Sequence, residues 1–101
     1  MIVQRNTVRY KVGKVQEANA LLIAERARLL EEKRNLPQAY RYYSPLDSDV
    51  DVSIGEYEFE TSEEMDKFWN NWNAQPEAQA FLEKYNALTE GEMVTEYFNL
   101  F

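Results

Sequence analysis

The chain has 101 residues and a formal net charge of −7, with 45% hydrophobic residues, 29% charged residues and no His or Cys. This composition is typical of one folded globular domain covering residues 1–101. The acidic balance argues against nucleic acid or an acidic membrane surface as a partner. Because His and Cys ligands and a Gly-rich phosphate loop are absent, we expect no haem, zinc or flavin cofactor.

The sequence has no apolar window approaching about 18 residues, and its first residues lack the pattern of a signal peptide. A cytoplasmic location is therefore expected.

Hydrophobic and polar residues alternate over residues 2–12, which predicts a first strand that Gly13 ends. One face of this strand carries Ile2, Gln4, Asn6, Val8, Tyr10 and Val12. The other face carries Val3, Arg5, Thr7, Arg9 and Lys11.

An apolar stripe at helical spacing predicts a helix over residues 14–35. The spacing of Glu25, Arg28 and Glu32 is typical of ion pairs on a solvated helix face. Beyond Pro37, short strands are predicted over 38–43 and 50–60, with a polar turn over 46–49 between them.

Thr61 precedes Glu64 at the capping-box spacing, which predicts the start of a second helix. Its inward positions are Met65, Phe68, Trp69 and Trp72. Pro76 opens a third helical segment that ends by Gly91, and the alternation over 92–101 predicts a fourth strand.

The order β-α-β-β-α(α)-β predicts an α+β, ferredoxin-like βαββαβ subunit, in which a four-stranded antiparallel sheet carries its helices on one face. Strand one then lies beside strand three. Arg5, Arg9 and Lys11 are therefore expected to face glutamates of strand three, which are Glu56, Glu58 and Glu60. The uncovered face of the sheet predicts a homodimer.

The chain resembles the dimeric α/β-barrel superfamily, which includes antibiotic-biosynthesis monooxygenase, haem-degrading monooxygenase, EthD-like and NIPSNAP-like domains. The resemblance covers nearly the whole chain and rests on the Val12-Gly13-Lys14 turn and on the segment over residues 58–69. It implies a homodimeric barrel of two facing sheets, with a ligand pocket between each sheet and its own helices.

The resemblance also implies two pocket positions. Asn6 matches a strand-one asparagine of the haem-degrading branch, and Phe59 matches that branch's pocket tryptophan. The haem-ligating histidine has no counterpart in this chain, which argues against haem degradation.

Two interpretations of the candidate site residues remain open. Asn6 could bind a ligand carbonyl or stabilise an oxyanion, with Tyr10 and Tyr57 as proton donors, or its amide could simply bond its neighbours. An aromatic set could line a pocket for a small aromatic ligand or could be ordinary core. This set comprises Tyr57, Phe59, Trp69, Trp72, Phe81, Tyr85 and Tyr97.

The resulting hypothesis is a small-molecule enzyme resembling cofactor-free monooxygenases. The alternative is a non-catalytic homodimeric module that binds a small molecule or has a structural role, and an adaptor would require an exposed apolar patch beyond the dimer face. A cavity of roughly 300 Å³ or more beside Asn6 and Tyr57 would favour the enzyme, whereas a filled interior would favour the module.

Overall fold

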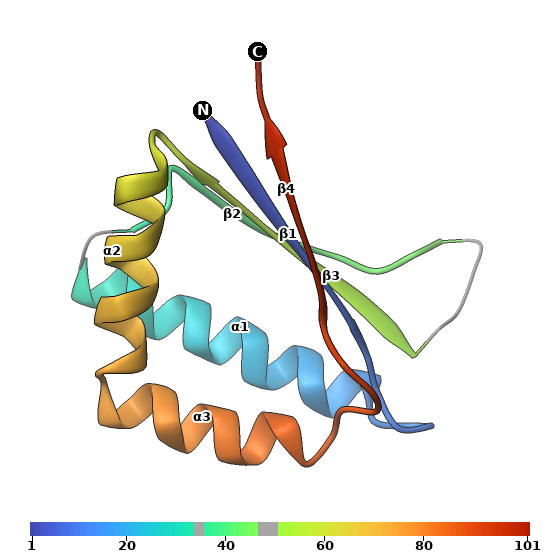
Figure 1. Ribbon diagram of the computed structural model, residues 1–101. Helices are drawn as coiled ribbons and strands as arrows, with labels where there is room; N and C mark the ends of the chain where they lie inside the picture. Colours follow the sequence, from blue (N-terminus) through green and yellow to red (C-terminus); the bar gives the residue numbers. More distant parts are fainter. Residues whose placement is uncertain (34–35, 47–50) are drawn as a thin grey trace.

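The computed structural model describes residues 1–33, 36–46 and 51–101. Within them the chain forms β1 (Ile2–Arg9), α1 (Val15–Glu32), β2 (Ala39–Tyr43), β3 (Val52–Phe59), α2 (Ser62–Asn73), α3 (Pro76–Asn86) and β4 (Val94–Asn99). The strands form one antiparallel sheet in the order β2-β3-β1-β4. All three helices lie on one side of it (Figure 1). The predicted α+β, ferredoxin-like subunit is confirmed.

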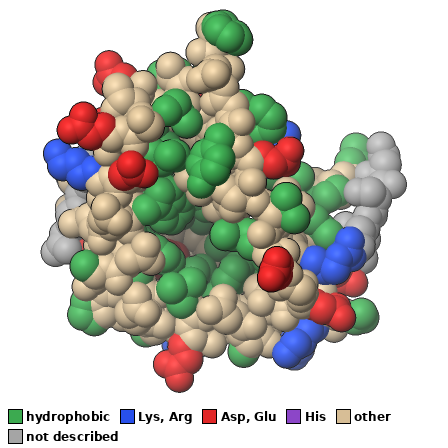
Figure 2. All heavy atoms as spheres, in the orientation of Figure 1, with side chains coloured by type: hydrophobic (Ala, Val, Ile, Leu, Met, Phe, Trp, Pro, Cys, Tyr) green, Lys and Arg blue, Asp and Glu red, His purple; other side chains and the backbone are tan. Residues whose placement is uncertain are grey.

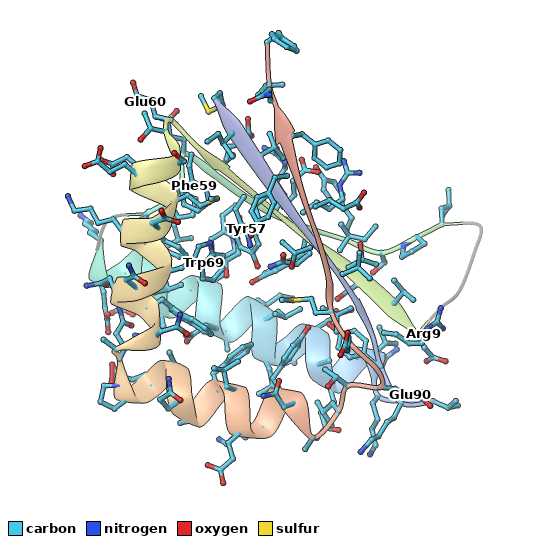
Figure 3. The ribbon with its side chains drawn as sticks, in the orientation of Figure 1. Arg9, Tyr57, Phe59, Glu60, Trp69 and Glu90 are labelled. Carbon is cyan, nitrogen blue, oxygen red and sulfur yellow. The ribbon has the colours of Figure 1, made fainter. Side chains whose placement is uncertain are left out.

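Most differences from the predicted elements lie at their ends. β1 stops at Arg9 rather than at residue 12, because regular pairing with β3 ends where Arg9 lies opposite Val52. Beyond this point the chain is held by single contacts, including the hydrogen bond from the Glu90 amide to the Arg9 carbonyl (2.8 Å). Figure 3 shows these two residues side by side where the α3–β4 connection meets β1. The helix predicted to residue 35 ends at Glu32, and positions 34–35 and 47–50 lie outside the described residues.

The pairing register sets one row of residues across the sheet. Asn6 of β1 lies opposite Gly55 of β3 on one side and Thr95 of β4 on the other. Tyr42 of β2 in turn lies opposite Gly55. The next row on the same face places Gln4 opposite Tyr57. Asn6, Gly55 and Tyr57 therefore share the face of the sheet that turns toward the helices.

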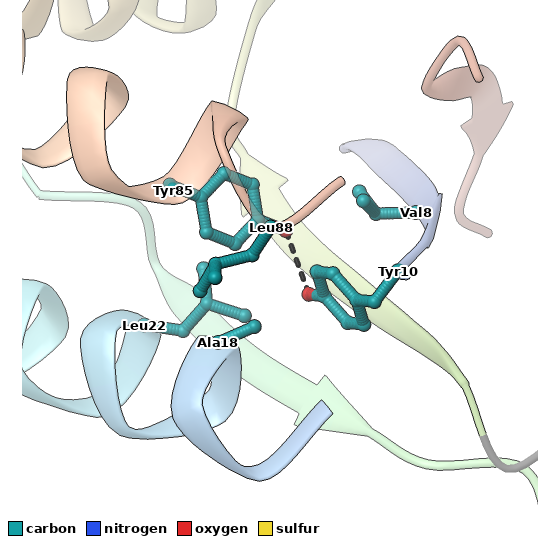
Figure 4. Close-up of a cluster of buried hydrophobic side chains, with 6 residues drawn as sticks. All are labelled: Val8, Tyr10, Ala18, Leu22, Tyr85 and Leu88. Atoms are coloured by element: carbon teal, nitrogen blue, oxygen red, sulfur yellow. Dashed lines mark hydrogen bonds between the residues drawn. The ribbon is translucent and has the colours of Figure 1, made fainter. Parts of the chain in front are cut away.

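Two buried clusters join the sheet to the helices. The first cluster contains Val8, Tyr10, Ala18, Leu22, Tyr85 and Leu88 (Figure 4). In it the Tyr10 hydroxyl bonds the hydroxyls of Tyr85 (2.7 Å) and Ser53 (2.5 Å). The second cluster contains Leu29, Tyr57, Phe59, Phe68, Trp72 and Ala78. α2 reaches this cluster from a capped start, because the Thr61 hydroxyl accepts a hydrogen bond from the Glu64 amide (3.1 Å), as the capping box predicts.

The opposite face of the sheet carries a charged network. Arg5 pairs with Glu56 (3.1 Å), which confirms the predicted cross-strand ion pair. Arg41 of β2 pairs with both Glu56 (2.9 Å) and Glu58 (2.6 Å). Arg41 was not among the predicted partners of these glutamates, because only the pairing register shows that it lies opposite Glu56.

The other two basic residues of strand one do not lie opposite those glutamates. The register places Arg9 opposite Val52, and the Lys11 ammonium donates to the Ala87 carbonyl (2.9 Å).

Gly55 occupies the middle of a strand for a packing reason. A Cβ atom at this position would lie 2.9 Å from the Tyr57 hydroxyl oxygen and 3.4 Å from Cε1 of Tyr42. Glycine within a strand often marks such a close approach. The absent side chain therefore leaves room for two phenol rings that lie against the sheet.

The charged network predicts a loss of stability in acid. Hydrogen bonds from Arg41 and Arg5 outweigh burial and hold the pKa of Glu56 below its ordinary value of 4.5. Its contribution to stability is then complete above the unfolded-state pKa and is lost as pH falls through the folded-state pKa. Urea unfolding measured from about pH 6 down to about pH 3 should show this loss, and Glu56→Gln should reduce it.

The matched control is Glu60→Gln, which removes an exposed carboxylate bonded to the neutral amide of Gln38. An equal reduction of the acid dependence in this control would contradict the role assigned to the Glu56 network.

Gly55→Ala should destabilise the protein by about 1–3 kcal/mol, because the added methyl group would lie 2.9 Å from the Tyr57 hydroxyl oxygen and force that ring to shift. Urea unfolding of Gly55→Ala, Tyr57→Phe and the double variant measures the coupling between the two positions. The cost of Gly55→Ala should fall in the Tyr57→Phe background, where the hydroxyl is missing. An unchanged cost there would reject this contact as the reason for glycine.

Candidate functional site

A cavity of about 260 Å³ lies between the sheet and the helices. Residues of both buried clusters line it, and exposed residues of the α3–β4 connection, including Gly91 and Met93, line one end. Figure 2 shows the hollow on this face of the molecule, ringed by hydrophobic side chains. The cavity is therefore formed within one chain and reaches the surface beside β4.

Eight aromatic side chains line the cavity: Tyr40, Tyr42, Tyr57, Phe68, Trp69, Trp72, Phe81 and Tyr85. Several of them touch in series from β2 to α3. The centre of the Tyr57 ring lies 4.8 Å from that of Tyr40 and 5.1 Å from that of Trp69. Figure 3 shows Tyr57 and Trp69 close together between the sheet and α2. Mostly edge-on contacts of this kind are favourable and fix the orientation of each ring.

The structure places six of the predicted site residues on this wall: Asn6, Tyr57, Trp69, Trp72, Phe81 and Tyr85. Three others lie elsewhere. Tyr10 is buried behind the wall, where its hydroxyl bonds Ser53 and Tyr85. Phe59 packs in the second cluster against Phe68, with ring centres 5.7 Å apart. Tyr97 is 60% exposed on β4, which is an edge strand of the sheet.

The phenols on the sheet side of the cavity form a hydrogen-bonded group. The hydroxyls of Tyr40 and Tyr42 are 2.6 Å apart, and the Tyr57 hydroxyl interacts with both of them and with Asn6. Burial is the main cause that raises the pKa of all three phenols above the ordinary value. They are therefore neutral at physiological pH, and each can donate or accept a hydrogen bond without acting as a phenolate base.

Asn6 belongs to a polar chain that ends on an aromatic ring. Its side-chain oxygen accepts hydrogen bonds from the amide of Gln4 (3.2 Å) and the hydroxyl of Thr95 (3.0 Å). The Gln4 oxygen in turn accepts from the indole N–H of Trp69 (2.7 Å). Two donors occupy the Asn6 oxygen, so the group that Asn6 can offer to a ligand is its NH₂.

Glu25 was predicted to lie on a solvated face of the first helix, and this prediction was wrong. Its side chain is 8% exposed, and it lines the cavity. One carboxylate oxygen accepts from Nε of Arg28 (2.7 Å), and the other accepts from Nη2 of Arg28 (2.8 Å) and from the indole N–H of Trp72 (2.7 Å).

Burial on its own would raise the pKa of Glu25, but the hydrogen bonds from Arg28 and Trp72 outweigh it, and that pKa lies below its ordinary value. The carboxylate is therefore ionised at neutral pH. The burial of Glu25 could have been inferred from the sequence, because Glu25 lies between Leu22 and Leu29 in the buried stripe of α1.

The described residues contain no group of three His, Cys, Asp or Glu side chains that could hold a metal ion. In the same part of the chain, no helix combines the length and apolar character needed to cross a membrane.

No family model and no curated protein matches this sequence. Solved structures do match its fold. A NIPSNAP domain protein from Burkholderia xenovorans shares 16% identity at a TM-score of 0.79, covering 99% of this chain and 94% of its own. A NIPSNAP family protein of unknown function from Agrobacterium tumefaciens shares 15% identity at a TM-score of 0.79, covering 97% of this chain and 86% of its own.

An antibiotic biosynthesis monooxygenase shares 13% identity at a TM-score of 0.69, covering 100% of this chain and 99% of its own. These identities establish similarity of fold alone. The predicted resemblance is confirmed at that level: the chain has the fold shared by NIPSNAP family proteins and antibiotic biosynthesis monooxygenases.

Proposed function

We propose that this protein is a small-molecule enzyme that acts on an electron-rich aromatic compound in the sheet–helix cavity, with chemistry of the cofactor-free monooxygenase kind. The observation that carries the proposal is the cavity wall, which combines aromatic rings with neutral hydroxyl and amide groups. The fold shared with an antibiotic biosynthesis monooxygenase supports the same class of activity.

The size of the cavity favours a site for a small ligand over an interior filled by the protein's own side chains. Its volume of about 260 Å³ is slightly below the expected threshold of roughly 300 Å³ and near the lower end for ligand sites. A compound of one or two rings fits such a space. An open cavity supports ligand binding over a structural module whose interior is filled by its own side chains.

The proposed chemistry follows from the groups around Tyr57. Neutral phenols and the NH₂ group of Asn6 donate hydrogen bonds that would stabilise a phenolate or enolate of the ligand. Such an anion carries carbanion character on its ring and can reduce oxygen directly. One oxygen atom then becomes a carbonyl on that ring carbon, which gives a quinone-type product. The other oxygen atom leaves as water with two hydrogen atoms of the ligand, the one displaced from that carbon and the one from the phenol hydroxyl.

We also propose that the chain forms a homodimer through the helix-free face of its sheet. Three apolar residues of the β4 region lie on that face and are exposed: Val94 (56%), Phe98 (41%) and Leu100 (47%). β4 is also an unpaired edge of the sheet. A second copy would cover both the apolar residues and the edge, which a stable protein normally protects.

The enzyme proposal is tested with a panel of hydroxylated aromatic compounds, using the fluorescence of Trp69 and Trp72 for binding and an oxygen electrode for turnover. At least one compound should bind and consume oxygen. Asn6→Ala and Tyr57→Phe should each weaken binding by roughly tenfold, because each removes a buried hydrogen-bond donor.

Tyr43→Phe is the matched control, since it removes an exposed phenol hydroxyl of β2 that accepts from Arg41 outside the cavity. Binding without oxygen uptake would support the non-catalytic module. Binding that is indifferent to Asn6 and Tyr57 would exclude this cavity as the site.

The dimer is tested by light scattering at micromolar concentration, where the measured mass should be about twice that of the chain. Phe98→Glu should shift the protein to monomer by placing a charge in the proposed interface. The control is Ile23→Glu, at a 63% exposed position on α1, which should leave the mass unchanged. A monomeric wild type would reject the dimer without affecting the subunit fold.

A further inference from the structure

The cavity wall contains a buried carboxylate that the proposed chemistry does not use. We propose that the ligand carries a protonated amine on a short arm of its aromatic ring, and that Glu25 binds this amine. The inference rests on the proposed function in taking the same cavity as the ligand site, and it adds the charge of the ligand to that proposal.

The first argument is the unused hydrogen-bonding capacity of Glu25. An ionised carboxylate has about four acceptor positions. The contacts to Arg28 and Trp72 occupy three of them, one on the first oxygen and two on the second. Because the side chain lines the cavity and is buried, a ligand N–H is a suitable donor for the remaining position.

The second argument is that Arg28 is shared among carboxylates. Besides Glu25 it contacts Glu32 (3.2 Å) and Glu77 (3.4 Å), which belong to α1 and to the first turn of α3. Its single positive charge therefore faces three negative ones. The cavity wall, in the part of the chain that the structure describes, includes no Lys or Arg side chain. The balance of charge at this end of the cavity favours a cationic ligand and disfavours an anionic one.

The third argument is the aromatic surroundings of the carboxylate. Trp72, which donates to Glu25, has its ring centre 5.8 Å from that of Trp69 and 6.0 Å from that of Phe81. Faces of aromatic rings attract ammonium groups, and more strongly where water is excluded. A guanidinium already lies near one ring of the wall, since Cζ of Arg26 is 5.9 Å from the centre of the Tyr40 ring. An amine bound to Glu25 would thus be surrounded by rings as well as paired with a charge.

The test uses three compounds that share one phenol ring and differ at the end of a short arm: tyramine, tyrosol and para-hydroxyphenylacetate. At neutral pH their arms end in an ammonium, a hydroxyl and a carboxylate. Calorimetric titration of the wild-type protein should show tyramine binding at least about tenfold more tightly than tyrosol, as expected for a hydrogen bond between charged groups. The acid should bind more weakly than either.

Glu25→Gln keeps an acceptor for the Trp72 indole but removes the charge. This variant should lose roughly ten- to a hundredfold of its affinity for tyramine and little of its affinity for tyrosol. Glu77→Gln is the matched control, because it removes another carboxylate partner of Arg28 that does not line the cavity. It should lose far less of its affinity for tyramine than Glu25→Gln does, because Glu77 acts only through Arg28, and it should bind tyrosol as the wild type does.

The inference would be overturned if tyrosol bound as tightly as tyramine or if tyramine did not bind. The ratio of the two affinities in the wild-type protein decides this even if Glu25→Gln does not fold. An equal loss of both compounds in Glu25→Gln would also overturn it, since that result would mean that Glu25 only supports the wall. Tyramine binding that depends on Glu25 without oxygen consumption would support the inference and count against the proposed enzyme.

Discussion

The register of β1 against β3 determines which side chains reach the space beneath the helices. It sets Asn6 opposite Gly55 and Gln4 opposite Tyr57, so that their shared face turns toward the helices. Because side chains alternate along a strand, a slip of one residue in β1 would turn Arg5 toward the helices and Asn6 away from them. Two contacts fit the observed register: the Arg5–Glu56 ion pair on the far face and the phenol of Tyr57 above Gly55. The cavity and the charged face therefore depend on the same alignment.

Aromatic rings on the facing surfaces help to keep the cavity open. Each ring is held edge-on or stacked by its neighbours, from Tyr40 on β2 to Tyr85 on α3, at centre distances of 4.8 to 6.0 Å. Hydrogen bonds fix two of these rings further, since Gln4 holds the indole of Trp69 and Glu25 holds that of Trp72. Rings held in this way cannot collapse into the space between them as freely as leucine or methionine side chains could.

Local patterns were sufficient to predict the order of the elements and the cap at Thr61, whereas the pocket-facing side of β3 was implied by the resemblance. They were not sufficient where burial depends on a distant element. Glu25 has an i,i+3 relation to Arg28 that is equally typical of a solvated helix face, and its burial follows from the approach of Trp72 on α2. The alternation around Tyr97 gave the side of the sheet on which it lies, opposite Gln4, but not its exposure at the edge of the sheet. Periodicity determines the direction of a side chain, whereas its environment depends on the packing of whole elements.

The Glu25–Arg28 pair differs in its energetics from the ion pairs on the far face. Arg5 and Arg41 are about two-fifths exposed, at 42% and 41%, so each guanidinium stays in contact with water, although Glu56 itself is only 12% exposed. Burying Glu25 beneath Trp72 removes a carboxylate from water, and replacing such a pair by apolar residues is often neutral or stabilising. An apolar residue at this position would also have completed the stripe of Ala18, Leu22 and Leu29 on α1. Stability therefore gives little reason for a charge in the wall of an aromatic cavity, whereas recognition of a ligand of opposite charge gives a direct one.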